Sequence, residues 1–367
     1  MTDARRPSAS LTIYDVARRA GVSIASVSRV LNQQGSPRPE TRARVLRAVR
    51  ELGFVPDGAA RALSNRLKEV VSVVFRRGGE AVFEGEGQSL LFTDVINRGI
   101  EPAAQHRGYD VLMSSVGLHD QHAAERLSAL AAKSDGLILH DRILPAAGVA
   151  KLAKRIPIVT LAGTPAPPAV NVRSDNEAGM RAIVRHLLLD HGYRSIAYLS
   201  GHADSPDNLA RVRGFEIEAD AAGAEIFAGP AWEGNYSAAG GAKVVTSLLA
   251  AGGKLPRAIA CANDQAALGV IYALAERGFE VPRDVAVTGF DDIPVARHLQ
   301  PPLTTGRQPI WELGTTAFDV LYSMISGEPQ TEPEVVLPVE LVVRGSCGCV
   351  PEPVSPPVLA HADGEAR

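Results

Sequence analysis

Residues 12–32 read TIYDVARRAGVSIASVSRVLN, and this stretch decides how the chain begins to fold. Its first half places small apolar residues at the i, i+3, i+4, i+7 spacing that lines one face of a helix. These residues are Ile13, Val16, Ala17 and Ala20. Gly21 then ends the pattern, as a glycine at the C-terminal end of a helix does. The stretch therefore predicts a first short helix over residues 13–20.

A second helix is predicted directly after this turn. Ser23 stands at the position of a helix N-cap, and residues 24–31 repeat the helical spacing. The inward positions are Val27, Val30 and Leu31. Two short helices joined by a tight glycine turn form a helix-turn-helix, and a third, arginine-rich helix is predicted between Pro39 and Gly53. An ordinary helical hairpin inside a larger core is the alternative, but this pair is basic and lies at one end of the sequence.

From Val70 onward the sequence changes character. Short β-branched runs such as VVSVVF, DGLILH and DVAVTGF alternate with helical stretches. The helical stretches include 175–190, 208–222, 236–250 and 264–277. This alternation predicts parallel sheets covered by helices, and its length of about 280 residues favours two α/β lobes over one sheet. The proline-rich residues 348–367 are expected to form a disordered tail.

The charge is distributed unevenly along the chain. Residues 1–66 hold 12 arginines, no lysine and five acids, a net charge of +7, which leaves −10 for the rest of a chain whose total is −3. A basic module on an acidic body is typical of a nucleic-acid binder that has a second task. Solubilising arms can also be basic, so this signal gains weight only together with the helix-turn-helix.

Targeting signals and metal-binding motifs are both weak. No apolar run approaches the roughly 18 residues of a membrane span, and MTDARRPSAS lacks the apolar stretch of a signal peptide, so we expect a cytoplasmic protein without a membrane partner. Three cysteines do not make a disulfide framework. Cys347 and Cys349 have no second ligand pair close by in the sequence, and His119 and His122 have no further ligands around them. We therefore expect neither a metal site nor a cofactor.

The second predicted helix carries the candidate DNA contacts. In a helix-turn-helix this helix lies in the major groove and presents its first residues to base edges. Its first residues are Ile24, Ala25 and Ser26, and one turn further on are Ser28 and Arg29. Small apolar side chains can meet a thymine methyl group, while Arg29 can reach a base or a phosphate. These five residues are the predicted contacts to double-stranded DNA.

At this point the chain resembles a known family. TIYDVARRAGVSIASVSRVLN, followed by TRARVLRAVRELGFVPDGAARALSN, is similar to the DNA-binding head of the lactose/galactose repressor family. Later segments resemble the same family in the same order. They are VRSDNEAG, RVRGF, ANDQAALGV, DVAVTGFDD, PPLTTGRQP and LPVELVVRGS. The resemblance covers roughly residues 11–347.

The resemblance gives the weak helical stretch 58–65 a role. In the family this segment is a hinge helix that folds when two copies meet over the DNA minor groove. Leu63 matches the leucine that the family inserts between base pairs, with Ala60 beside it, and such an apolar wedge unstacks a base step and bends the duplex. Without the resemblance Leu63 would pass for a buried helix residue. Asp57 stands where the family usually has asparagine, so a backbone contact to phosphate there is not expected.

For the body, the resemblance implies a periplasmic sugar-binding fold, in which two α/β lobes close on a small molecule. Arg211 matches the family's ligand-clamping arginine, Asn263 and Asp291 match residues that meet ligand hydroxyls, and Tyr236 matches an aromatic that packs on the ligand. Helix caps or helix–strand packing are the alternative roles of these four residues. The family's asparagine–proline–aromatic–aromatic motif is missing, although Phe92 fits one aromatic position. Ala162 replaces a residue that is often acidic, which leaves the ligand class open.

Together these features predict four parts: a helix-turn-helix head (residues 1–56), a hinge helix (57–66), a body of two α/β lobes (67–347) and a tail (348–367). The predicted function is transcriptional regulation, as a homodimeric repressor that binds an inverted-repeat operator under the control of a small molecule, expected to be a sugar or sugar derivative. An enzyme of sugar metabolism is one rival, but the sequence lacks phosphate-loop, nucleophile-elbow and zinc-protease motifs. A secreted sugar-binding protein is the other, and it would not explain the basic head.

Overall fold

The computed structural model describes residues 11–31, 36–54, 67–77, 90–117, 120–140 and 142–350, without the side chains of 77 and 90–92. The head contains three helices, as the sequence predicts. They are α1 (Ile13–Ala20), α2 (Ile24–Leu31) and α3 (Pro39–Leu52). Their apolar faces form a small core of Val16, Ala17, Ala20, Val27, Val30, Val45, Ala48 and Phe54. The head therefore has a core of its own, although it is a small one.

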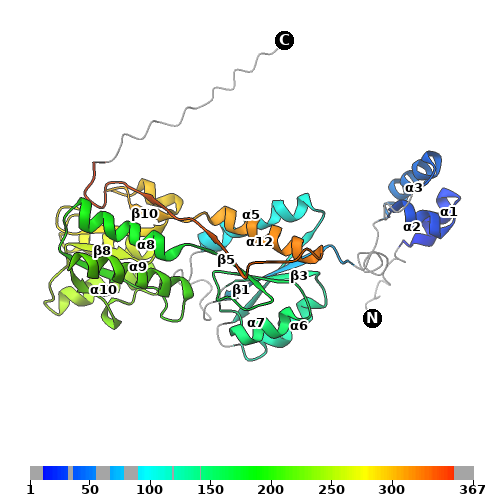
Figure 1. Cartoon of the computed structure of the whole chain (residues 1–367). Helices are drawn as coiled ribbons and strands as arrows, with labels where there is room; N and C mark the ends of the chain where they lie inside the picture. The colour runs from blue at the N-terminus through cyan, green and yellow to red at the C-terminus, as the bar shows by residue number, and fades with distance from the viewer. Residues whose placement is uncertain are drawn as a thin grey trace, which may run out of the picture. The chain divides into compact units, whose positions relative to one another are not determined.

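The body consists of two lobes, each built on a six-stranded sheet (Figure 1). The sheet of the first lobe has the order β11-β5-β4-β3-β1-β2. Its strands are β1 (Val70–Arg77), β2 (Asp110–Gly117), β3 (Gly136–His140), β4 (Ile158–Leu161), β5 (Val170–Ser174) and β11 (Glu334–Leu337). Its helices are α5 (Leu90–His106), α6 (Ala123–Ala131), α7 (Ala146–Ala153) and α12 (Ile310–Ile325).

The sheet of the second lobe has the order β12-β10-β9-β8-β6-β7, with β12 antiparallel to its neighbour β10. Its strands are β6 (Ser195–Leu199), β7 (Glu225–Phe227), β8 (Ala258–Cys261), β9 (Ala286–Asp291), β10 (Thr304–Arg307) and β12 (Glu340–Val342). Its α-helices are α8 (Asn176–Arg185), α9 (Pro206–Ala222), α10 (Ala238–Ala250) and α11 (Asp264–Glu276). Short turns of other helix types are η1 (His186–Asp190), η2 (Pro230–Trp232) and η3 (Pro294–His298).

Buried apolar residues cover both faces of each sheet, which explains the continuous β-branched runs in the sequence. Glycines let the covering helices approach closely. A Cβ on Gly99 of α5 would lie 2.3 Å from the carbonyl oxygen of Trp311 in α12, and one on Gly314 would lie 2.2 Å from that of Ile96. The prediction of two lobes of parallel sheet covered by helices is confirmed.

The chain passes between the two lobes three times, at β5 to α8, at β10 to α12 and at β11 to β12. The sheets lie side by side in Figure 1, and the orange and red segments that connect them belong to the second and third passages. A change in the angle between the lobes must alter the backbone of these three connections. Residues on them are therefore placed to respond to a ligand between the lobes.

Candidate functional site

The helix-turn-helix is held in shape by local hydrogen bonds. The Asp15 carboxylate accepts hydrogen bonds from the Thr12 backbone N–H at 2.9 Å and from the Thr12 hydroxyl at 2.7 Å, which fixes the start of α1. Gly21 adopts the left-handed backbone conformation, φ 63°, at the turn. The Ser26 N–H donates to Ser23 Oγ at 3.2 Å. Ser23 therefore caps the start of α2, as the sequence predicts.

The exposed side of α2 carries the predicted DNA contacts. Val27 and Val30 are buried in the head, and the opposite side presents Ile24, whose side chain is 41% exposed, together with exposed Ala25 and Arg29. Ser26 and Ser28 are half-buried. Arg29 Nε donates to the Ala25 carbonyl oxygen at 3.2 Å, which holds the guanidinium along the helix surface. These five residues therefore lie where a DNA groove could reach them. Asp57, Ala60 and Leu63 lie outside the described residues.

The body holds a cleft of about 150 Å³ that both lobes line. The first lobe contributes side chains that follow or end β1, β3 and β4, and the second lobe contributes residues from the ends of β6, β8 and β9. The lining residues include Phe75, Arg76, His140, Arg142, Ala162, His202, Asp207, Arg211, Tyr236, Asn263, Asp291 and Gln308. The cleft thus lies beyond the carboxyl ends of parallel strands, where open α/β sheets bind ligands. It unites four of the five predicted ligand contacts.

Arg211 lies on α9 and is the most constrained residue of the cleft. Its side chain is 3% exposed, and the guanidinium stacks on Phe290 with 3.9 Å between the carbon Cζ and the ring centroid. Nε donates to Asn176 Oδ1 at 2.8 Å, and Nη1 donates to the Ala262 carbonyl oxygen at 2.5 Å. A buried cation held from three sides is well placed to fix an oxygen-rich ligand.

Asp291 ends β9 and shares the cleft with Arg211. Its Oδ1 accepts a hydrogen bond of 2.6 Å from Gln308 Nε2. Burial raises the pKa of Asp291 to about 6, although Arg211 and the Gln308 hydrogen bond act in the opposite direction. The carboxyl group therefore titrates close to neutral pH, where a ligand can change its protonation.

Asn263 and Tyr236 combine structural roles with a place in the cleft. Asn263 Oδ1 caps α11 by accepting from the Ala266 N–H at 2.9 Å, and Nδ2 donates to the Tyr236 carbonyl oxygen at 3.1 Å. The alternative role as a helix cap is therefore real for Asn263, while its side chain still lines the cleft. The Tyr236 hydroxyl donates to Ser205 Oγ at 3.3 Å, and burial raises its pKa to about 12. Phe92 lies in the first turn of α5, and its side chain is outside the described part.

Several cleft residues escaped prediction. His140 Nε2 and Gln308 Oε1 are buried polar atoms that have no hydrogen-bond partner within the described part of the chain. Burial lowers the pKa of His140 to about 4, so its imidazole is neutral and offers one donor and one acceptor. Buried polar atoms nearly always find partners. A polar ligand in the cleft would supply them.

The first lobe also brings two arginines, Arg76 and Arg142, to the rim of the cleft. Arg142 forms a short ion pair with Asp204 of the second lobe, and Arg76 Nη1 lies 4.0 Å from the same carboxylate. Burial lowers the pKa of the neighbouring His202, and the charges of Arg142 and Arg76 lower it further. One end of the cleft is therefore electropositive and is bridged by charges from both lobes.

The backbone of the cleft is strained at four residues. Arg142, Ala162, Tyr236 and Asp291 have φ values of 58°, 56°, 61° and 118°, which residues other than glycine rarely adopt. Each such residue costs about 1–3 kcal/mol and persists only where the surrounding fold imposes it. All four line the cleft, two from the first lobe and two from the second, and they are four of the seven such residues in the described part of the chain.

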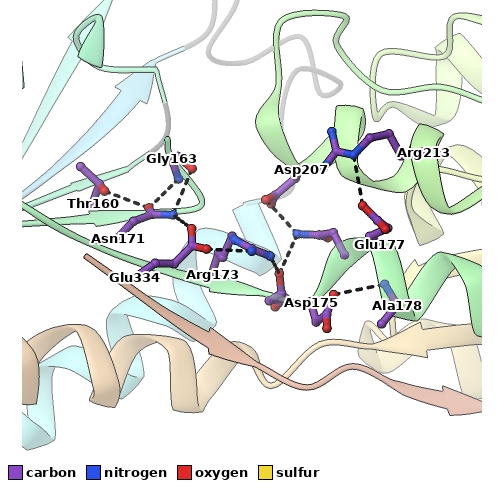
Figure 2. Close-up of polar contacts among 12 residues, drawn as sticks. Thr160, Gly163, Asn171, Arg173, Asp175, Glu177, Ala178, Asp207, Arg213 and Glu334 are labelled. Atoms are coloured by element: carbon purple, nitrogen blue, oxygen red, sulfur yellow. Dashed lines mark hydrogen bonds and ion pairs between the residues drawn. The ribbon is translucent and has the colours of Figure 1, made fainter. Parts of the chain in front are cut away.

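Hydrogen bonds connect the cleft to the passages between the lobes. Asn176, at the first passage, accepts from Arg211 and donates to Asp207 Oδ1 at 2.9 Å. Gln308, which binds Asp291, lies on the second passage. Figure 2 shows Arg173 and Glu334 side by side where β5 and β11 pair, with 2.8 Å between Arg173 Nη2 and Glu334 Oε2. Cleft-lining side chains thus bind directly to two of the three connecting segments.

Cys347 and Cys349 have no second ligand pair close by in the sequence, but the fold places two histidines beside them. Cys347 lies 3.4 Å from His186, a residue 161 positions away, and Cys349 contacts His191. Gly348 and Cys349, which we assigned to the tail, pack against the second lobe, whereas residues 351–367 lie outside the described part. His122 lies directly before α6 and pairs with Glu125 at 3.2 Å, as expected of a solvated helix start.

A helix-turn-helix head combined with a two-lobed body that holds a polar cleft defines a DNA-binding regulator with its own ligand-binding domain. Comparison with protein families agrees: residues 12–57 match the family model of bacterial regulatory proteins, lacI family, and residues 184–347 match a periplasmic binding protein-like domain. The chain belongs to the lacI family, and it is a transcriptional regulator. The resemblance found in the sequence is confirmed.

Relatives match over almost the whole chain. Catabolite control protein A of Priestia megaterium is 31% identical over 343 residues, which is 92% of this chain and 99% of that protein. The transcriptional repressor PurR of Histophilus somni is 30% identical over 91% of this chain and 98% of its own length. A lac repressor dimer bound to operator and the anti-inducer ONPF superimposes with a TM-score of 0.80, at 29% identity, over 92% of this chain and 99% of that one. Among the described residues no helix is long and apolar enough to cross a membrane.

Proposed function

We propose that this regulator is a repressor whose operator affinity is set by a small polyhydroxylated molecule in the cleft between the lobes. The observation that carries the proposal is the direct bonding of cleft residues to two of the three passages, through Arg211 to Asn176 and through Asp291 to Gln308. A ligand can shift an equilibrium only by binding its two states unequally. The contacts between a ligand and these side chains change with the angle between the lobes. The ligand therefore binds the two arrangements of the lobes with unequal affinity.

The cleft favours a sugar or sugar derivative as the effector. Arg211, Asp291, Asn263 and the neutral His140 present donors and acceptors in alternation, and Tyr236 offers an aromatic face, a combination that suits a ring bearing several hydroxyl groups. The absence of an acidic residue at Ala162 and the arginines at the rim also admit a ligand with an acidic substituent. The test panel therefore includes neutral sugars, sugar phosphates and sugar acids.

Several further parts of the proposal follow from the family. We propose a cytoplasmic homodimer without enzymatic activity that binds an inverted-repeat operator, with a head at residues 1–56, a hinge at 57–66, a body that begins at residue 67 and includes Gly348 and Cys349, and a tail beyond them. The lac repressor structure is a dimer on its operator, and two heads on a two-fold axis require a symmetric site.

Ala60 and Leu63 remain predicted minor-groove contacts. Leu63→Ala should lessen operator bending, which a circular-permutation gel assay measures; an unchanged bend would remove Leu63 from the mechanism.

The proposal is tested with the full-length protein. An operator is first selected from random duplex DNA, and its affinity is then measured by fluorescence anisotropy with each compound of the panel. Thermal-shift measurements on the same panel report which compounds bind the protein. We expect one class of compound to raise the melting temperature and to change operator affinity by roughly 5- to 150-fold, the usual range of such couplings. A compound that binds the cleft and leaves operator affinity unchanged would contradict the proposal.

We propose that Arg29 contacts a base, and we therefore expect Arg29→Ala to weaken operator binding by about 1–3 kcal/mol. Binding of unrelated DNA should weaken much less, and affinity of both proteins should fall steeply with salt. Arg50→Ala, which removes an exposed arginine from the last turn of α3, is the matched control. Competition assays against operator and random duplex measure the two affinities. An equal loss on both would show that Arg29 contacts only phosphate.

Effector binding should depend on pH through Asp291. With a pKa of about 6, the ionised fraction of this carboxyl group rises about tenfold between pH 5 and pH 7. A neutral sugar donates hydroxyl protons to the carboxylate, so its affinity should rise by up to about tenfold over this interval. Isothermal titration calorimetry measures the rise, which Asp291→Asn should abolish. His202→Gln should retain it, and a rise lost in that variant instead would assign the titration to His202.

Ionisation of Asp291 favours binding of a neutral sugar, but it lowers the free energy of unfolding of the ligand-free protein. Because burial raises the Asp291 pKa above its unfolded value, the folded state favours the protonated carboxyl group. Its contribution to the free energy of unfolding is therefore largest below the unfolded pKa of about 4 and declines as pH rises through about 6. Ligand affinity and the stability of the ligand-free protein should thus change in opposite directions.

A further inference from the structure

Four side chains that could hold a metal ion meet on the second lobe, and none of them lines the cleft. They are His186, His191, Cys347 and Cys349, and their ligand atoms all lie within 4.8 Å of one another. The two Nε2 atoms of the histidines are 3.2 Å apart. Cys347 Sγ lies 3.4 Å from His186 Nε2, and Cys349 Sγ lies 3.7 Å from His186 Nε2 and 3.4 Å from His191 Nε2.

These separations match a tetrahedron around one ion. Zinc binds histidine nitrogen at about 2.0–2.1 Å and thiolate sulfur at about 2.3 Å, so a tetrahedral site separates two nitrogens by about 3.3 Å and a nitrogen from a sulfur by about 3.5 Å. The observed nitrogen–nitrogen distance is 3.2 Å, and three nitrogen–sulfur distances are 3.4, 3.4 and 3.7 Å. Two cysteines and two histidines form a familiar ligand set of structural zinc sites.

The local fold is shaped to bring the two histidines together. In an α-helix, residues five apart point about 140° away from each other, because each residue turns the chain by 100°. Here the chain leaves α8 through the π-turn η1, in which the His191 N–H donates to the His186 carbonyl oxygen at 3.3 Å. The i to i+5 bond places both imidazoles on one side. Single π-turns are rare in proteins, and those that occur often lie at functional sites.

Neighbouring groups prepare these ligands for a cation. Asp190 Oδ2 lies 2.7 Å from His186 Nδ1, so the proton on Nδ1 points to the carboxylate and the lone pair of Nε2 points to the cluster. The Thr304 hydroxyl accepts from the Arg344 N–H at 2.8 Å and donates to Cys347 Sγ at 3.1 Å. A carboxylate behind a histidine and a donor to a sulfur are the outer contacts typical of metal ligands.

We propose that His186, His191, Cys347 and Cys349 bind one structural zinc ion, which fastens the segment after β12 to the second lobe. Four protein ligands leave no open position, so the site is structural and not catalytic. His186 and Cys347 are buried, while His191 and Cys349 are half-buried, which leaves a route of entry from the surface. The proposal is independent of the effector and of the operator.

Zinc content and cobalt spectroscopy test the site on the full-length protein. We expect one zinc per chain after purification under reducing conditions. After removal of zinc by a chelator, added Co²⁺ should give visible absorption of a tetrahedral site and a thiolate-to-cobalt charge-transfer band. Cys349→Ser and His191→Gln should lose stoichiometric zinc, whereas Cys261→Ala and His122→Gln serve as controls that retain it. Asp190→Asn should weaken zinc affinity by roughly 10- to 100-fold.

Thermal unfolding and metal content together show whether the four side chains bind zinc. Zinc removal should lower the melting temperature of the wild type, and readdition should restore it, because an ion bound only to the folded state stabilises it. Circular dichroism shows whether each variant is folded. Wild-type protein that binds neither ion under reducing conditions would overturn the proposal, whatever the variants do. So would a disulfide between Cys347 and Cys349 in protein purified under the same conditions.

Discussion

Arg211→Ala should yield a repressor that still binds its operator but no longer responds to its effector. The side chain is 3% exposed and is surrounded by Phe290, Asn176 and the Ala262 carbonyl group. Loss of a buried charged donor leaves ligand oxygens without a partner and costs about 1.5–3 kcal/mol, a drop in effector affinity of roughly 10- to 150-fold. If the effector is an inducer, the variant represses permanently; if it is a corepressor, the variant is constitutively released.

Arg213→Ala provides the matched control for this experiment. Arg213 lies two residues further along α9, its side chain is 57% exposed, and its Nε pairs with Glu177 at 3.1 Å (Figure 2). The same change of charge on the same helix should leave effector binding and operator release intact. Operator binding is measured across an effector titration for wild type and both variants, with thermal unfolding as a check on folding. A curve for Arg211→Ala that superimposes on the wild type would place the ligand elsewhere.

Local patterns were enough to predict the head. The spacing of Val16, Ala17 and Ala20, the glycine turn and the Ser23 cap act within a few residues of one another, so residues 12–32 alone predict the helix-turn-helix. The alternation of strands and helices predicted the two lobes for the same reason. The order of strands in each sheet did not follow from these patterns, because it depends on contacts between distant segments.

The cleft was predictable only where the family resemblance supplied a role. Arg211, Tyr236, Asn263 and Asp291 match family positions, and all four line the cleft. His140 was missed because it ends a buried strand and looks like a core residue in the sequence. Its significance lies in a buried nitrogen that has no hydrogen-bond partner among the described residues, which only three-dimensional packing reveals.

The four proposed zinc ligands also could not be predicted from the sequence, because they lie far apart in it. Cys347 and His186 are 161 positions apart, and the i to i+5 spacing of the histidines fits neither a helical nor a strand face. Sequence reasoning looked for a second ligand pair nearby and found none. The π-turn that joins the two imidazoles has no recognised sequence signal, so this cluster became visible only when the fold placed β12 beside the end of α8.

Val27→Asp should abolish operator binding while effector binding persists. Val27 is fully buried among Val16, Val30 and Val45, and a carboxylate there has no partner within the described head. Burying an unpaired charge costs several kcal/mol, and a core of eight buried residues cannot offset it, since domains of this size are marginally stable. We expect the head to unfold and operator affinity to fall by more than about 1,000-fold, because binding then requires refolding of the head.

The control for Val27→Asp adds the same charge at a solvent-facing position of the head. Leu46 on α3 is 36% exposed, so Leu46→Asp should leave the three helices folded and reduce operator affinity only modestly, through repulsion from phosphates. Circular dichroism of the full chain reports the lost helix content, and calorimetry with the effector reports the body, whose clusters of buried residues do not include Val27. If Val27→Asp bound operator within tenfold of the wild type, a folded helix-turn-helix would not be the element that reads DNA. If it lost effector binding as well, the head and the body would not fold as separate units.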